Sequence, residues 1–155
     1  MSAWILVSDA SKANLYGAEL PESPWSRIET FEHPEGREMS REIEATSPPG
    51  RGQQGAAQGG RRTAFEPRTS PKEVELQRFA RQLSTYLEAA VARHSFESLV
   101  LVAPPHFLGT LNGALGRQTA KRVQATIDKD LTMFDAPELR QRLVDAVFPA
   151  NPDSQ

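Results

Sequence analysis

The sequence predicts a single α/β domain. Its length and the alternation of its elements lead to this class, and its lack of cysteine restricts how the fold is stabilised. The 155 residues fit one domain and are enough to build a hydrophobic core. Short apolar runs rich in β-branched residues alternate with longer segments of helical periodicity in the second half of the chain. No cysteine is present, which excludes disulfides and thiolate zinc sites as the source of stability.

Three short strands are expected in the first part of the chain. The apolar run at 4–7 predicts a buried strand, which Ser8 and Asp9 end. A second strand is expected at 14–20, before a turn that is rich in proline and serine. Residues 28–33 alternate in polarity and predict a third, half-exposed strand.

Residues 46–69 differ in composition from the rest and predict a flexible loop. Glycine, glutamine and proline dominate, and Phe65 is the only large apolar side chain. Burial therefore cannot offset the entropy lost on ordering. The domain is expected to span 1–148 with this loop inserted, followed by a disordered tail at 149–155.

The second half predicts helices that alternate with strands. Ser70, Pro71 and Glu73 combine a helix N-cap, a proline in the first turn and a capping-box glutamate before an apolar stripe. A continuous apolar strand follows at 99–103, then a short helix at 107–115. An alternating strand at 123–127 precedes a last helix, which Asp135 caps.

The resulting element order is β-β-β-α-β-α-β-α, with five strands in one mixed sheet flanked by helices. Strands joined by short turns should pair antiparallel, whereas strands joined through helices should pair parallel. This is the order of ribonuclease H-like and translational-component α/β folds.

Polar side chains that follow the strands predict a pocket at the sheet's carboxyl edge, where open α/β sheets bind ligands. The candidates are Asp9, His106, Lys129 and Asp130. A two-metal nuclease is disfavoured, because no acid follows the strand at 99–103. Each candidate also has a simpler interpretation as a turn residue or a solvated surface residue.

No metal and no small-molecule cofactor is expected. The three histidines lack metal-ligand spacing, and the loop glycines match neither a P-loop nor a dinucleotide-binding turn. The net charge is -2, so no global field attracts nucleic acid or membrane. No apolar run is long enough to span a membrane, and a cytoplasmic location is expected.

The loop region carries the cations that point to RNA. Guanidinium groups pair well with phosphates, and basic flexible segments often become ordered on RNA. The predicted phosphate contacts are Arg37, Arg51, Arg61 and Arg62. A solvated linker without a partner is the alternative.

Several segments together resemble the bacterial host attachment protein family, whose members are described as required for attachment to host cells. The resemblance covers nearly the whole chain and is most specific around Ala103-Pro104-Pro105-His106-Phe107-Leu108-Gly109 and Asp128-Lys129-Asp130-Leu131-Thr132. The remaining segments that carry it are Ile5 to Ala13, His33 to Arg37 and Pro49 to Arg51.

That family is similar to the central domain of archaeal and eukaryotic peptide-chain release factors. The resemblance implies a translational-component fold and a role at ribosomes. In release factors the equivalent loop carries the catalytic Gly-Gly-Gln. Here the loop reads Gly50-Arg51-Gly52-Gln53-Gln54-Gly55 and lacks that motif. A glutamine where the second glycine is needed obstructs the close approach of backbone to RNA, so no catalytic residue is carried over.

The sequence therefore predicts a non-catalytic binding protein that contacts RNA or the ribosome through its basic loop. Two alternatives stay open. One is a small hydrolase of aminoacyl- or peptidyl-tRNA esters, which would depend on Gln53, Gln54 or His106. The other is a structural interaction protein, as a homo-oligomer, that affects attachment indirectly.

Overall fold

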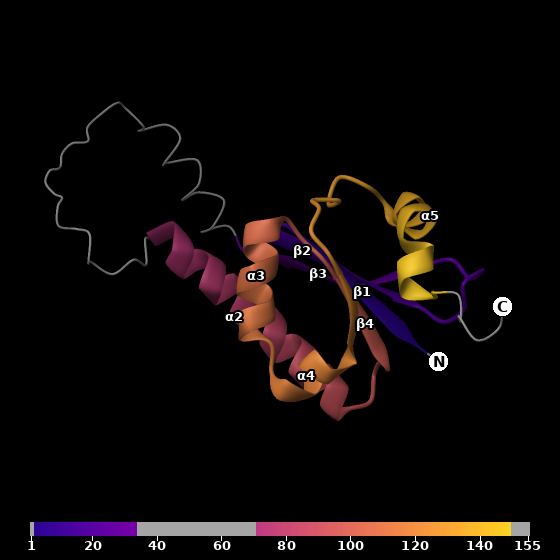
Figure 1. The fold of residues 1–155 in the computed structure, drawn as a ribbon, viewed down its shortest axis with the longest axis horizontal. Coiled ribbons are helices and arrows are strands. Elements are labelled where there is room, and N and C mark those ends of the chain that lie inside the picture. Colours follow the sequence, from indigo (N-terminus) through magenta and orange to yellow (C-terminus); the bar gives the residue numbers. More distant parts are fainter. Residues whose placement is uncertain (1, 34–70, 150–155) are drawn as a thin grey trace, which may run out of the picture.

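The computed structural model describes residues 2–33 and 71–149 of the chain. It confirms an α/β fold with one mixed five-stranded sheet, whose strands lie in the order β3-β2-β1-β4-β5 (Figure 1). The finer likeness to ribonuclease H-like folds stays a prediction. In chain order the elements are β1 Ala3–Ser8, β2 Lys12–Ala18, β3 Ser26–Glu32, α2 Pro71–Ala92, β4 Ser98–Val102, α3 Pro105–Ala114, α4 Arg117–Arg122, β5 Val123–Ile127 and α5 Ala136–Val147.

The strand pairing follows the connections, as predicted. Strands β1, β2 and β3 are joined by short turns and pair antiparallel. Strands β1, β4 and β5 are joined through helices and pair parallel. All six residues of β1 are buried, because this strand is central in the sheet and both of its faces are covered.

Helices cover both faces of the sheet. Trp4 and Leu6 of β1 point into the core shared with α2 and α3, whereas Ile5 and Val7 point into the core shared with α5. Successive side chains alternate along a strand, so one apolar run supplies both cores. In Figure 1, α2, α3 and α4 lie together while α5 lies apart from them.

Two strands begin earlier than the sequence predicts. Strand β2 starts at Lys12 rather than at residue 14, because the Asp9 carboxylate holds a tight turn: its Oδ1 accepts the backbone N–H groups of Ser11 and Lys12, both at 2.8 Å. Pairing with β1 therefore begins at once, at Ala13. Strand β3 likewise begins at Ser26 rather than at residue 28.

Helix α4 was not expected from the sequence. Its six residues have no apolar periodicity, and a helix this short is not stable on its own. A contact from outside the helix supplies what the local sequence lacks. The Oε1 atom of Glu88, on α2, accepts both the hydroxyl of Thr119 at 2.7 Å and its backbone N–H at 3.2 Å.

Three expectations lie outside the described residues. They are the flexible loop at 46–69, the Ser70 cap and the tail predicted at 149–155, of which the structure describes only Pro149. The predicted cap of the last helix is confirmed, since Asp135 Oδ1 accepts the backbone N–H of Glu138 at 3.3 Å.

Candidate nucleic-acid interface

One edge of the sheet collects both strand ends and helix starts. Strands β1, β3, β4 and β5 all run in the same direction, so their carboxyl ends share this edge. Helices α2, α3 and α5 begin at this edge, because each runs back along the sheet. Helix N-termini carry partial positive charge and unpaired N–H groups, which favour anions.

His33 ties the end of β3 to the first turns of α2. Its Nε2 atom lies 2.8 Å from Glu75 Oε1, and both side chains are only 12% exposed. The imidazole ring stacks on Phe79 at 5.5 Å between centroids, and Phe79 in turn stacks on Phe107 of α3 at 5.7 Å. This arrangement fixes His33, the last described residue before residue 34, against the helical layer.

His106 forms a similar link from α3 but is far more exposed. Its Nε2 atom lies 2.9 Å from Glu73 Oε1, with the His106 side chain 71% exposed. The first turns of α2 and α3 are therefore joined at their surfaces. The N-cap of α3, Pro104, offers no side-chain hydrogen bond to the helix. The adjacent N–H groups of this turn are oriented toward the same edge as the His106 ring.

The other predicted edge residues take local roles. Asp9 holds the turn between β1 and β2, and Asp130 Oδ1 accepts the hydroxyl and N–H of Thr132 at 2.7 and 3.1 Å. Lys129 is exposed. All four predicted residues follow strands at this edge, but no hydrogen bond or ion pair among the described residues joins one to another. The predicted phosphate contacts lie outside the described residues: Arg37, Arg51, Arg61 and Arg62.

The outer face of α2, α3 and α4 carries exposed cations and no exposed carboxylate. These helices hold three acidic residues, and each of the three accepts hydrogen bonds inside the protein: Glu73 from His106, Glu75 from His33 and Arg78, and Glu88 from Thr119. None of the three is fully exposed. We call this surface the basic helical face, and its exposed cations are Lys72, Arg78, Arg81, Arg117 and Lys121.

Other parts of the described surface are mainly negative. Exposed acids concentrate on the hairpin of β2 and β3 and on the loops before α5, among them Glu22, Glu29, Glu32, Asp128 and Asp130. The overall charge of -2 therefore conceals two regions of opposite sign. A surface patch of one sign attracts a charged partner even when the whole protein does not.

A groove of about 490 Å³ crosses the basic helical face between α2 and α3. Gln77 and Arg81 of α2 form one wall of this groove. Gly109 and Gly113 of α3 form much of the other wall, and a Cβ atom added at either glycine would meet nothing within 4 Å. A partner can therefore approach the backbone of α3 closely. The guanidinium group of Arg81 lies beside this stretch and forms no ion pair with any described residue.

The Glu88 carboxylate is the one acid of these helices whose titration is clearly perturbed. The hydrogen bond from the Thr119 hydroxyl lowers the pKa of Glu88 below its ordinary 4.5, and backbone N–H groups of Thr119 and Gln118 add to this, against a smaller opposing effect of desolvation. Glu88 is thus ionised and committed to α4 at neutral pH. Among the described residues, Glu88 forms no ion pair with the cations of α4.

Within residues 2–33 and 71–149, no group of three or more histidine or acidic side chains is placed to hold a metal ion. No helix in this part of the chain is long and apolar enough to cross a membrane.

Sequence reasoning missed two features. The basic helical face went unnoticed because exposed positions on α2 and α4 become neighbours only in space, and because the pairing of Glu73, Glu75 and Glu88 depends on tertiary contacts. A second cavity, of about 610 Å³, lies at the opposite, amino edge of the parallel strands. No local sequence pattern predicts this cavity, because its wall combines residues from five separate elements.

Comparison with known proteins gives one family match. The sequence matches the family described as "Protein required for attachment to host cells" over residues 4–143. Curated proteins gave no match. Among solved structures the chain is similar to an "Archaeal protein", with 8% identity, a TM-score of 0.48, and coverage of 94% of this chain and 35% of that chain. It is also similar to an archaeal translation termination factor, with 11% identity, a TM-score of 0.46, and coverage of 94% and 36%. The chain spans about a third of the length of these two proteins.

Proposed function

The chain belongs to the family of proteins required for attachment to host cells, and within that family we propose that it is an RNA-binding protein. It contacts phosphates through the basic helical face, together with the arginines of residues 51–62, and binds without cleaving. One observation carries the proposal: exposed cations on α2 and α4 stand without an exposed acid among them.

Phosphate contacts need cations that are not already neutralised. Arg81, Arg117 and Lys121 form no ion pair with any residue that the structure describes. Arginine binds phosphate through a planar fork of donors, and each contact releases condensed counterions from the nucleic acid. The groove beside Arg81 admits a phosphate backbone close to α3, because Gly109 and Gly113 present no side chain.

The same face does not suit a lipid surface. Membrane-binding helices add large apolar side chains to their cations. The exposed large apolar residues of the described chain are Leu20, Ile28 and Met133. They lie on the β2–β3 hairpin and before α5, away from the basic helical face. The exposed residues of α2, α3 and α4 include no Phe, Tyr or Trp on which bases stack, and His106 is their one exposed aromatic ring, so the binding depends mainly on phosphates.

The chain positions on either side of residues 34–70 both lie at the carboxyl edge. The described chain reaches that edge at His33 and leaves it again at Pro71. Both points are held to the helical layer, His33 by Glu75 and the α2 start through the pair of Glu73 and His106. The two described points between which residues 34–70 run therefore lie at the carboxyl edge, next to the starts of α2 and α3.

The test is binding of fluorescent single-stranded RNA, followed by anisotropy, with variants of matched charge. We expect Arg81→Gln/Lys121→Gln to weaken binding about tenfold or more, since it removes two phosphate contacts. The control Arg27→Gln/Arg142→Gln removes the same charge from β3 and α5 and should change affinity less than about twofold. Equal losses in both variants would show a response to net charge alone, and absence of RNA binding would refute the proposal. Arg61→Ala/Arg62→Ala measures the separate contribution of residues 51–62.

A further inference from the structure

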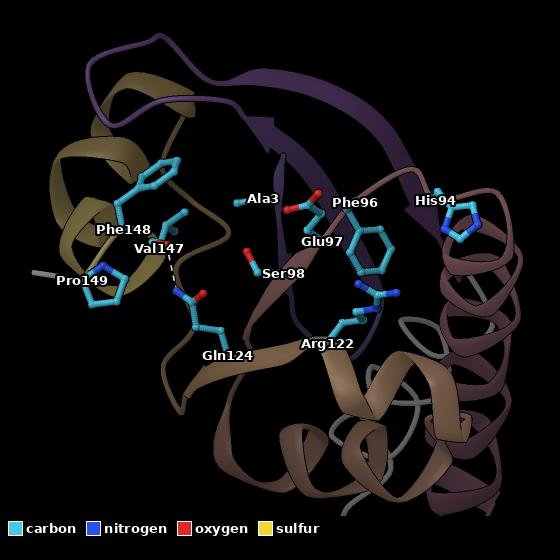
Figure 2. A pocket seen from close by; sticks show the side chains of 10 residues that line it. All are labelled: Ala3, His94, Phe96, Glu97, Ser98, Arg122, Gln124, Val147, Phe148 and Pro149. Atoms are coloured by element: carbon cyan, nitrogen blue, oxygen red, sulfur yellow. Dashed lines mark hydrogen bonds between the residues drawn. The ribbon is translucent and has the colours of Figure 1, made fainter. Parts of the chain in front are cut away.

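A cavity at the amino edge of the parallel strands, on the far side of the sheet from the carboxyl edge, has the features of a small-molecule site. Its floor is formed by the paired starts of β1 and β4, Ala3 and Ser98. Figure 2 shows Phe148 and Pro149 on one side of the cavity, with Phe96, Arg122 and His94 on the other. Its volume of about 610 Å³ lies in the range of pockets that hold small ligands.

The apolar wall is held in a fixed position. The side-chain amide of Gln124 donates hydrogen bonds to the carbonyl oxygens of Ala146 and Val147, at 2.7 and 2.8 Å. These bonds fasten the end of α5 to β5 and thereby place Val147 and Phe148 on the cavity (Figure 2). A wall fixed in this way costs a ligand little ordering on binding.

The opposite wall includes the only non-glycine residue with positive φ among the described residues. His94, with φ of 58°, ends α2 with the hydrogen bonds of a Schellman motif: its N–H donates to Val91 O at 2.9 Å, and that of Ser95 donates to Ala90 O at 2.9 Å. Glycine is the residue that suits this position. A histidine there retains backbone strain while presenting a polar side chain to the cavity, a pattern that occurs at ligand sites.

Two opposite charges line the cavity, and neither is paired with another described residue. Arg122, the last residue of α4, and Glu97, just before β4, form no side-chain hydrogen bond or ion pair with any residue that the structure describes. They are also not paired with each other. The carbonyl ends of α2, α4 and α5 converge on this edge and favour a positive group beside Glu97.

From this arrangement we propose that the cavity binds a zwitterion of the amino-acid type. The ligand carboxylate pairs with Arg122, the ligand ammonium group lies by Glu97, and an apolar side chain packs on Val147 and Phe148. A free apolar amino acid and an apolar dipeptide share this chemistry. The site is independent of the basic helical face, because it lies at the other edge of the sheet.

The experiment is a titration of the ¹⁵N-labelled full chain, followed by NMR, with leucine, phenylalanine and the dipeptide Leu-Leu. Saturable shifts at Ser98, Gln124 and Phe148 are expected. Comparing the affinity for the free amino acids with that for the dipeptide shows which of the two classes the cavity binds. N-acetyl-leucine amide, which lacks both charges, should produce no saturable shifts. Absence of saturation with all three zwitterions, or equal binding of the capped compound, overturns the proposal.

Matched variants separate the two charges. Arg122→Gln should weaken zwitterion binding at least tenfold while leaving leucine amide unaffected, and Glu97→Gln should weaken both. Arg93→Gln and Asp145→Asn remove equivalent charges from neighbouring exposed positions outside the cavity and should leave binding unchanged. Unfolding midpoints without ligand confirm that each variant is folded. Zwitterion affinity that is the same in Arg122→Gln, Glu97→Gln and their controls would also overturn the proposal.

Discussion

Glu88 on α2 acts as the N-terminal cap of a helix to which it does not belong. Its Oε1 accepts the hydroxyl of Thr119 at 2.7 Å and its backbone N–H at 3.2 Å. The N-cap residue of α4, Gly116, has no side chain for this purpose. A Cβ atom at Gly116 would lie 2.6 Å from Glu88 Cδ, so the glycine leaves the space that the carboxylate occupies. The position of α4, and of its cations, therefore depends on one long-range contact.

This contact predicts a defined pH dependence of stability. Because the pKa of Glu88 is lowered from 4.5 in the folded state, the ionised carboxylate stabilises the fold above pH 4.5. The stabilisation is lost as pH falls through the lowered pKa. Glu88→Gln keeps an acceptor oxygen but cannot titrate, so its deficit relative to the natural chain should be present at pH 7 and shrink below pH 4.5. Urea unfolding across this range measures it, and a deficit of the same size at pH 7 and pH 3 would contradict the assignment.

Removing the acceptor altogether should cost more. Glu88→Ala leaves the fully buried hydroxyl of Thr119 without its partner, and a buried unsatisfied donor costs about 1–3 kcal/mol. Thr119→Val in the Glu88→Ala background is the control, because it removes the orphaned hydroxyl. Recovery of part of the lost unfolding free energy in the double variant is expected. No recovery would mean that the hydroxyl is satisfied in another way.

The glycines of α3 predict opposite effects on stability and on binding. A Cβ at Gly109 or Gly113 meets nothing within 4 Å, so Gly109→Ala should stabilise the chain by about 0.5–1 kcal/mol through higher helix propensity. The added methyl group lies in the groove beside Arg81 and should weaken RNA binding at the same time. Thermal unfolding and anisotropy measure the two effects. A stabilised variant with unchanged RNA affinity would remove the groove from the proposed contact surface.

The salt dependence of RNA binding counts the phosphate contacts directly. For single strands the slope of log K against log salt changes by about 0.7 for each phosphate neutralised. Arg81→Gln should therefore reduce the slope by about that amount, whereas Arg27→Gln, on β3, should leave it unchanged. Anisotropy titrations over a range of salt concentrations give the slope. A lower affinity with an unaltered slope would mean that Arg81 acts on the fold and not on phosphate.

The backbone at His94 predicts a substitution that stabilises the protein. His94 adopts φ of 58° at the end of α2, a conformation that costs a side-chain-bearing residue more than it costs glycine. Part of the gain is offset by the greater freedom of glycine in the unfolded chain. His94→Gly should therefore raise the free energy of unfolding by about 0.5–1 kcal/mol. A loss of stability in urea unfolding would show that the imidazole contributes contacts that outweigh the strain.

Much of the fold followed from the sequence, because local patterns specify local structure. The continuous apolar run at 99–103 predicts a strand covered on both faces, and Asp135 with Glu138 predicts a helix start; the strand was confirmed at Ser98–Val102 and the helix start at Asp135. The strand directions followed from connection length alone. Local patterns did not predict helix α4, because the residue that caps it is Glu88, 31 positions away from Thr119 along the chain.

The candidate sites depended far more on the tertiary structure. By itself the sequence determined the α/β class, the order of the elements other than α4, the family resemblance and the basic composition of residues 51–62, since these rest on composition, periodicity and motifs. Only the folded chain decided that Glu73, Glu75 and Glu88 are engaged internally while Arg81 and Lys121 are not. Only the folded chain brought Arg122 and Glu97 to one cavity. The physical reason is that charge pairing and cavity walls are set by distances between residues that are remote in sequence, and a local pattern holds no information about those distances.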